Sequence, residues 1–196
     1  MSATRSRPSR DRVRLGMPDD YALGWLGRVL PGLQAVEFEI TCDLSAHLMA
    51  AVQRAEIDLA LVTLASRPGL AVAAKDVPLR WVRSGPLPDD ARLAAYPEGC
   101  VFRRAMIGAL ETAGESWQVT VQSRSHAGIF AAVRAGIAVT SVAAGTAPPD
   151  LIEFDAAVGF PALPAVPVYL VAAPTLRRAG RDLRDRLMAE LALVAV

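Results

Sequence analysis

The sequence predicts an α/β protein built from two Rossmann-like lobes. Short apolar runs typical of strands alternate with amphipathic segments of helical period, the pattern of parallel sheets with right-handed crossovers. This alternation stops at 84–90, a stretch with two prolines and a glycine that we expect to be a linker, and then begins again. The chain has 196 residues, 53% of them hydrophobic, which is enough for one sizeable core or two small ones.

The first lobe is expected to begin after a tail at 1–12 whose Ser-, Arg- and Pro-rich composition is typical of disorder. Asp19 and Asp20 are good helix N-caps and precede a helix that ends at Pro31. A second helix has its apolar residues on one face, namely Leu44, Leu48, Ala51, Val52 and Ala55. The strands of this series are predicted at 13–17, 36–41 and 57–62, with further strand-like pieces in 70–83.

The second lobe repeats the alternation. Its strands are predicted at 92–96, 117–122, 137–142 and 151–154, and its helices at 102–113 and 125–135. The chain then returns through a strand at 168–172 to a last helix, in which Arg181 and Asp185 are spaced to pair across one turn. Lobe I therefore comprises 13–86 plus 164–196, and lobe II comprises 87–163. Because lobe II is inserted into lobe I, two crossover linkers run side by side and give a hinge and a cleft.

Composition excludes several classes of protein. A net charge of +1 gives no field that would draw the molecule to nucleic acid or an anionic membrane. No apolar run is long enough for a signal peptide or a membrane span, so we expect a cytoplasmic protein without membrane contact. Cys42 and Cys100 are too few for a disulfide framework, and no Cys/His cluster indicates zinc. We expect neither a metal nor a cofactor.

Catalysis is not expected either. Ser125 and His126 are adjacent, and His47 follows Ser45 by two residues, so neither pair lies on one helix face as nucleophile and base. The sequence has no GxSxG elbow, no HExxH and no Gly-rich phosphate loop.

Four stretches of the sequence resemble the effector-binding domain of LysR-type transcriptional regulators. They are VRLGMPDDYALGWL, ITCDLSAHLMAAVQRAEIDLALVT, PEGCVFRRAMIGAL and SRSHAGIFAAVRAGIAVTSV, the last being similar to the family's VxxGxGxxxLP signature. The resemblance covers nearly all of 13–196. It implies a fold like that of type 2 periplasmic binding proteins, a small-molecule effector in the inter-lobe cleft, and antiparallel homodimers.

The sequence also departs from this family. Members begin with a winged helix-turn-helix and a linker helix, whereas only the Arg-rich tail precedes the first strand here, so DNA binding is not carried over to this chain. Ala55 stands where the family usually has Gly, and Ala143-Ala144 replaces the Leu-Pro that ends the signature.

Ligands of open α/β sheets lie at the carboxyl ends of strands, beside helix N-termini. Together with the resemblance, this rule predicts an effector pocket lined by Met17, Pro18, Asp19, Tyr21, Cys42, Ser45, Thr63, Cys100, Phe102, Arg103, Ser123 and Ser125. The acids at its edge favour a zwitterionic or cation-bearing ligand over a simple acid.

Several of these residues also have a purely structural interpretation. Ser45 and Ser125 suit helix caps, and Tyr21 and Phe102 suit packing. Arg103 suits either an anion clamp or a solvated position. Cys100 would sense oxidants only with a partner thiol, and nothing in the sequence places Cys42 near it.

The sequence thus predicts the small-molecule-sensing domain of a LysR-type regulator, in which ligand binding changes dimer geometry and transcription. Two alternatives remain open. One is a free-standing solute-binding protein, which the lack of a signal peptide disfavours. The other is a partner that dimerises with full-length regulators and blocks them, in which case it would co-purify with an intact paralogue.

Overall fold

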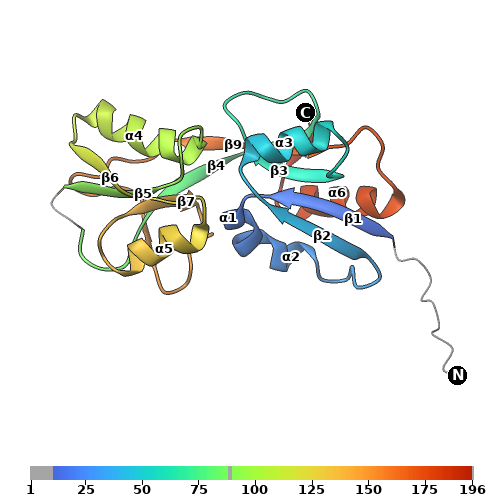
Figure 1. The fold of residues 1–196 in the computed structure, drawn as a ribbon, viewed down its shortest axis with the longest axis horizontal. Helices are drawn as coiled ribbons and strands as arrows, with labels where there is room; N and C mark the ends of the chain where they lie inside the picture. Colours follow the sequence, from blue (N-terminus) through green and yellow to red (C-terminus); the bar gives the residue numbers. More distant parts are fainter. Residues whose placement is uncertain (1–10, 88–89, 196) are drawn as a thin grey trace, which may run out of the picture.

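The computed structural model describes residues 11–87 and 90–195. Most of the predicted tail therefore lies outside the described residues. The chain forms two α/β lobes side by side, joined by two long strands (Figure 1). One lobe carries both ends of the described chain, and the other is inserted into it, as the sequence pattern indicates.

The first lobe is organised around one mixed sheet, with the strand order β10-β4-β9-β3-β1-β2. β1 pairs in parallel with β2 and β3, whereas β9 runs antiparallel to both β3 and β4. The strands are β1 (Arg12–Met17), β2 (Glu37–Cys42), β3 (Leu59–Thr63), β4 (Ala71–Arg83), β9 (Ala165–Ala172) and β10 (Val194–Ala195).

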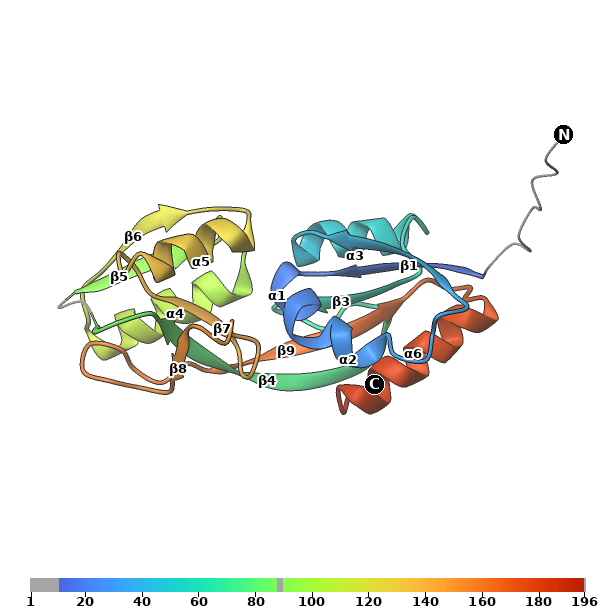
Figure 2. The same ribbon diagram turned by 90° about the horizontal axis from the view of Figure 1, so that it is seen from below.

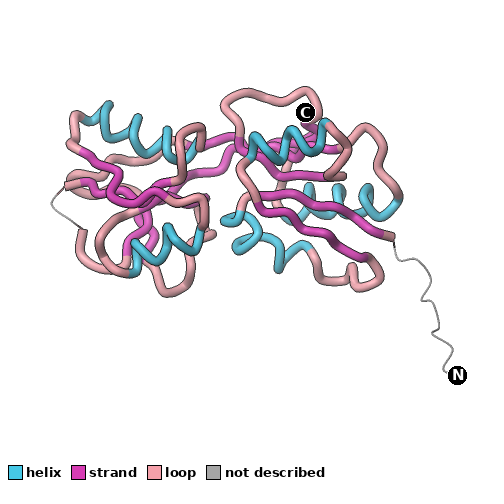
Figure 3. The backbone as a smooth tube through the Cα atoms, viewed as in Figure 1, coloured by secondary structure: helices cyan, strands magenta, loops and turns pink. Residues whose placement is uncertain are grey.

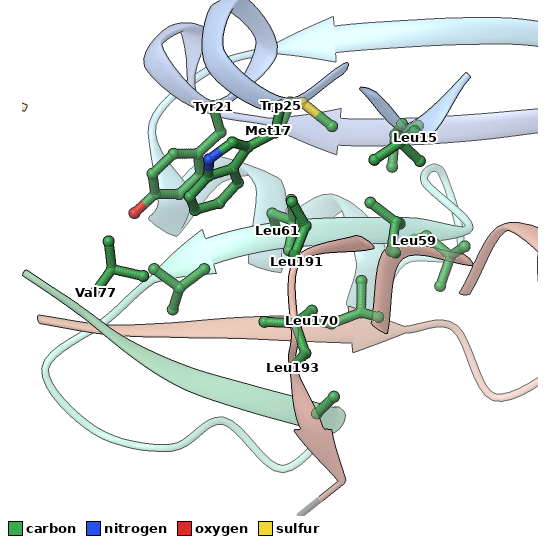
Figure 4. Close-up of a cluster of buried hydrophobic side chains, with 14 of the residues drawn as sticks. Leu15, Met17, Tyr21, Trp25, Leu59, Leu61, Val77, Leu170, Leu191 and Leu193 are labelled. Atoms are coloured by element: carbon green, nitrogen blue, oxygen red, sulfur yellow. The ribbon is translucent and has the colours of Figure 1, made fainter. Parts of the chain in front are cut away.

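Helices cover both faces of this sheet. In Figure 2, α3 (Ser45–Gln53) lies on one side of it, and α2 (Gly27–Val29) and α6 (Arg178–Glu190) lie on the other. The strand β3 is buried on both faces, so its alternate residues enter two cores. Leu59 and Leu61 pack with the α2 and α6 side, the cluster drawn in Figure 4, and Ala60 and Val62 pack with α3.

The second lobe has a smaller set of strands between two helices. β5 (Ala91–Ala95) pairs in parallel with β6 (Trp117–Gln122), and β7 (Thr140–Ala143) and β8 (Ile152–Phe154) pair with β4. The helix α4 (Val101–Ala113) packs on one core and α5 (His126–Arg134) on another.

The chain crosses between the lobes inside β4. Residues 71–78 pair with β9 in the first lobe, and residues 79–83 pair with β7 and β8 in the second. The expected linker at 84–90 is therefore wrong, because Ser84 already bonds the Val133 carbonyl of the second lobe, at 2.6 Å. The two linkers are the continuous, antiparallel strands β4 and β9, seen side by side in magenta between the lobes in Figure 3.

The first helix of the chain is continuous but not regular. It consists of α1 (Asp19–Tyr21), a π-helical turn η1 (Ala22–Leu26) and α2. The prediction that its acids are N-caps is wrong: Pro18 holds the N-cap position, and Asp20 is buried. Insertions of a π turn widen a helix and often accompany functional sites.

Two other local expectations differ from the structure, and a third is met in position only. Leu44, not Ser45, holds the N-cap position of α3. Ser125 does hold the predicted N-cap position of α5, but its side chain makes no cap bond. Arg181 donates to the Leu176 carbonyl, at 2.6 Å, instead of pairing with Asp185. The carboxylate of Asp185 pairs with its neighbour Arg184, at 2.7 Å.

The widened helix turn fits closely against the second lobe. Gly24 faces Thr146, and a Cβ placed on Gly24 would lie 2.8 Å from the Cβ and 3.3 Å from the Cα of Thr146. Thr146 is buried and its hydroxyl donates to the Ala143 carbonyl, at 2.7 Å. The lobes approach this closely only because residue 24 has no side chain.

Gly24→Ala is expected to destabilise the protein by roughly 1–3 kcal/mol, the range for overpacking, because the lobes must separate to admit the methyl group. Gly27→Ala is the matched control, since nothing lies within 4 Å of a Cβ there. Equilibrium urea unfolding measures both. Equal stability of the two variants would contradict a tight inter-lobe contact at Gly24.

Within the part of the chain that the structure describes, no helix has both the length and the apolar character needed to cross a bilayer.

Candidate ligand-binding site

A cavity of about 300 Å³ lies between the two lobes. The first lobe contributes the ends of β1, β2 and β3 with the starts of α1 and α3, and the second lobe contributes the segment from β5 into α4. The lining residues are Pro18, Asp19, Asp20, Tyr21, Cys42, Asp43, Leu44, Ser45, Ala46, His47, Thr63, Leu64, Tyr96, Glu98, Gly99, Cys100, Val101, Phe102 and Arg124.

The position of the cavity follows from the topology. Parallel strands end at one edge of a sheet, where the following helices begin with unpaired backbone N–H groups. Two such helices, α3 and α4, begin at the cavity from opposite lobes. The site therefore offers hydrogen-bond donors from both lobes to one small molecule.

Three of the predicted residues are joined by hydrogen bonds in the first lobe. The hydroxyls of Tyr21 and Thr63 lie 2.5 Å apart, and the Thr63 N–H donates to the Ser45 hydroxyl oxygen, at 2.9 Å. These bonds tie the starts of α1 and α3 to the end of β3. Ser45 thus holds the wall together across two elements, a role that the sequence did not indicate.

Aromatic rings form the contact between the lobes beside the cavity. The ring of Tyr21 stacks on Trp25, with centroids 4.3 Å apart, and meets Phe102 of the second lobe edge-on, at 6.3 Å. Burial raises the pKa of the Tyr21 hydroxyl well above its usual value, so the hydroxyl stays neutral. Packing is thus one role of both Tyr21 and Phe102, and both also line the cavity.

An acidic group is buried at the start of α1. Only 5% of Asp20 is exposed, and its Oδ2 has no hydrogen-bond partner among the described residues. Burial, and secondarily the neighbouring Asp19, raises the pKa of the Asp20 carboxyl to about 7. Buried polar atoms without a partner are rare in folded proteins and call for an explanation.

Cys42 and Cys100, both in the predicted lining set, line the same cavity from opposite lobes. Burial, followed by the hydrogen bond to Asp19, raises the pKa of the Cys42 thiol to about 11. Burial also raises the pKa of Cys100. Thiols that remain protonated react slowly, so the structure gives no support to oxidant sensing at Cys100.

The wall of the second lobe contains a second buried polar pair. The Tyr96 hydroxyl and His126 Nδ1 lie 2.6 Å apart. Burial lowers the pKa of His126 to about 4, so the ring is neutral near pH 7. Tyr96 lines the cavity, whereas His126 lies behind it and positions the Tyr96 ring.

Four of the predicted lining residues lie outside the cavity wall. Met17 is fully buried in the core of the first lobe, because strand alternation turns it away from the cavity. Arg103 donates to the Tyr96 carbonyl, at 3.0 Å, and to Gln122. The hydroxyl of Ser123 bonds the backbone of Ser125, so both serines shape the turn before α5.

The cavity also contains lining residues that were not predicted. Asp43 and His47 pair at 3.0 Å across the first turn of α3, a spacing that is visible in the sequence. Arg124 and Glu98 come from loops of the second lobe, and Tyr96 directly follows a strand. Tyr96 could have been predicted as a lining residue from its position one residue after the end of β5.

Comparisons with known proteins agree with this architecture. The family profile described as LysR substrate binding domain matches residues 6–192. Over 167 residues the chain is 29% identical to the HTH-type transcriptional regulator DgdR of Burkholderia cepacia, covering 81% of this chain and 56% of that protein. The chain thus spans little more than half the length of this relative.

Solved structures give the same result. The regulatory domain of CcmR from Synechocystis PCC6803, in complex with 2-PG, is similar with a TM-score of 0.66 and 19% identity, covering 91% of this chain and 96% of that one. The regulatory domain of MexT, a transcriptional activator in Pseudomonas aeruginosa, is similar with a TM-score of 0.71 and 16% identity, covering 92% and 98%. These similarities confirm the predicted fold class.

Proposed function

This chain belongs to the family of LysR substrate-binding domains, and we propose that it senses a small organic molecule in the cavity between its two lobes. The observation that carries the proposal is that residues of both lobes line one cavity of about 300 Å³ at the carboxyl ends of parallel strands. This is the size and place expected of a small-molecule site in an α/β fold. The similar CcmR domain, whose structure is described as a complex with 2-PG, supports the same interpretation.

The proposed signal is a change in the arrangement of the lobes. A ligand that contacts both lobes stabilises the closed arrangement, in which both lobes reach it. It shifts the equilibrium between open and closed arrangements only by the difference in its affinity for the two. The strands β4 and β9 are the only backbone crossings among the described residues, so they form the proposed hinge. One proposed moving lobe comprises residues 13–78 together with 165–195. The other comprises residues 79–164.

In a complete regulator this change would alter promoter contacts made by a DNA-binding domain. We propose that such a domain acts together with this one, and that the sensing unit is a homodimer. Binding without catalysis is proposed for the cavity. The Ser45 hydroxyl accepts from the Thr63 N–H and the Thr63 hydroxyl bonds that of Tyr21, and neither hydroxyl has a histidine or carboxylate partner in the described part of the chain.

A thermal-shift screen tests the proposed function. The panel contains amino acids, amines, aromatic acids and sugar phosphates. At a hundred times its Kd, a ligand stabilises the fold by about 2.7 kcal/mol, which for a chain of this size raises Tm by roughly 5–10 °C.

A pair of matched variants shows whether a compound that raises Tm binds inside this cavity. Ala46 lines the cavity, whereas Ala131 is exposed on α5 and does not. Ala46→Trp is expected to abolish the shift and Ala131→Trp to keep it. A shift that survives Ala46→Trp, or a panel without any shift, would contradict small-molecule sensing in this cavity.

A further inference from the structure

We propose that the ligand carries a protonated amine and that the buried carboxylate of Asp20 receives it. This inference rests on the proposed function and names the chemical class of the effector. Asp20 is one of the two adjacent acids that the sequence predicts at the edge of the pocket. Three observations about its side chain and surroundings carry the inference.

The first observation is that Asp20 has unused hydrogen-bonding capacity. The residue is 95% buried (5% exposed), and its Oδ2 has no partner among the described residues. A carboxylate so placed gains strongly from a cationic hydrogen-bond donor, because such bonds are about twice as strong as neutral ones and burial strengthens them further. A ligand ammonium supplies that donor.

The second observation is that Asp20 lines the cavity close to residues of both lobes. Asp20 is itself a lining residue, and its charge acts on lining residues of both lobes. Burial is the main reason that the pKa values of Tyr96 and Cys100, in the second lobe, are raised, and the charge of Asp20 raises both further. The pKa of Cys42 in the first lobe is raised mainly by burial and by Asp19, and the charge of Asp20 raises it further. The Asp20 carboxyl therefore lies close to the parts of the cavity wall that each lobe contributes.

The third observation is the balance of charge around the cavity. Four acids line it, namely Asp19, Asp20, Asp43 and Glu98, against one arginine, Arg124. His47 and the Leu44 N–H both bond the carboxylate of Asp43, which satisfies that acid. The remaining acids oppose a plain carboxylate or phosphate ligand and favour a group with positive charge.

The state of the Asp20 proton gives this inference a distinctive signature. With a pKa of about 7 in the ligand-free protein, the carboxyl is mostly protonated at pH 6 and mostly ionised at pH 8. An ammonium bound beside it favours the ionised form, so binding at pH 6 expels the proton. Nearly a full proton is expected to leave at pH 6, and almost none at pH 8.

The experiment uses matched triples of compounds: an α-amino acid, the carboxylic acid that lacks its amine, and the amine that lacks its carboxylate. Triples built on alanine, leucine and phenylalanine vary the size. Isothermal titration calorimetry in two buffers of different ionisation enthalpy gives Kd and proton release together. Compounds with the amine are expected to bind roughly 10–100-fold more tightly than their deamino partners.

Two variants complete the test. Asp20→Asn is expected to weaken amine binding roughly 10–100-fold and to abolish the proton release at pH 6. Asp76→Asn makes the same chemical change at an exposed acid that does not line the cavity, and it is expected to change Kd no more than about 3-fold.

Several results would overturn the inference. Equal affinity for deamino partners, unchanged binding in Asp20→Asn, or no binding by any amine would each do so. Tight binding of an amine-free compound that Ala46→Trp abolishes would overturn the amine assignment and leave the sensing function intact. If no compound of any class binds, both proposals fail together.

Discussion

Asp20→Asn is expected to raise the unfolding free energy of the ligand-free protein by about 3–5 kcal/mol at pH 8. The carboxyl has a pKa of about 7 in the folded chain against an ordinary value of 3.8, and each unit corresponds to about 1.4 kcal/mol. Below about pH 4 the Asp20 carboxyl is protonated in both the folded and the unfolded state, so its ionisation does not affect the free energy of unfolding. Between about pH 4 and 7 the folded state keeps a proton that the unfolded state has released, so wild-type stability falls as pH rises.

Urea unfolding from pH 4 to 8 measures this effect. Asp20→Asn is expected to lose the fall in stability over that window, while Asp76→Asn, at an exposed acid outside the cavity, keeps the wild-type profile. Identical profiles for Asp20→Asn and wild type would show that the Asp20 carboxyl is not a destabilising buried acid. A residue that weakens the fold but strengthens ligand binding is typical of a functional site.

Trp81→Ala is expected to destabilise the second lobe by roughly 3–5 kcal/mol, the range for removing a buried aromatic side chain. Trp81 is fully buried in β4 and packs edge-on against Phe160, with centroids 5.3 Å apart. Its indole N–H donates to the Pro161 carbonyl, at 2.7 Å. The residue therefore anchors the returning chain of the second lobe to a strand that both lobes share.

A series at this position separates packing from hydrogen bonding. Trp81→Phe keeps most of the apolar contact but leaves the Pro161 carbonyl without its donor, so about 1–3 kcal/mol of loss is expected. Unfolding is followed by far-UV circular dichroism. A loss below 1 kcal/mol for Trp81→Ala would contradict the assigned core of the second lobe.

Most of the secondary structure could be predicted, because buried strands and amphipathic helices leave clear periods in the sequence. The crossing between lobes could not. Pro78 interrupts the apolar pattern of β4 and suggests separate pieces, yet β4 is one strand of 13 residues. Proline is tolerated where a strand changes partners, because its missing N–H is not needed by the ladder there.

The resemblance anticipated another local feature. Ala55 stands where the family usually has Gly, and its φ is 55°, in the left-handed region that favours glycine. This position follows α3 and turns the chain toward β3. The positive φ at residue 55 thus explains why the family usually has glycine at this position.

The candidate site was predictable only in outline. Strand ends correctly pointed to the cavity edge, so Pro18, Cys42 and Thr63 were expected to line it, and they do. Side-chain direction was not predictable: Asp20 suits an exposed cap as well as a buried acid. The π turn that follows Asp20 has no clear sequence signal, and the contribution of Tyr96 depends on how the lobes meet.

The most direct test of the central claim is a crystal structure of the protein with the tightest-binding compound of the calorimetric panel. The account predicts a ligand that contacts Cys42 or Ser45 on one lobe and Cys100 or Phe102 on the other, with its nitrogen about 3 Å from the Asp20 carboxylate. A ligand bound outside this cavity, or one held by a single lobe, would contradict the account.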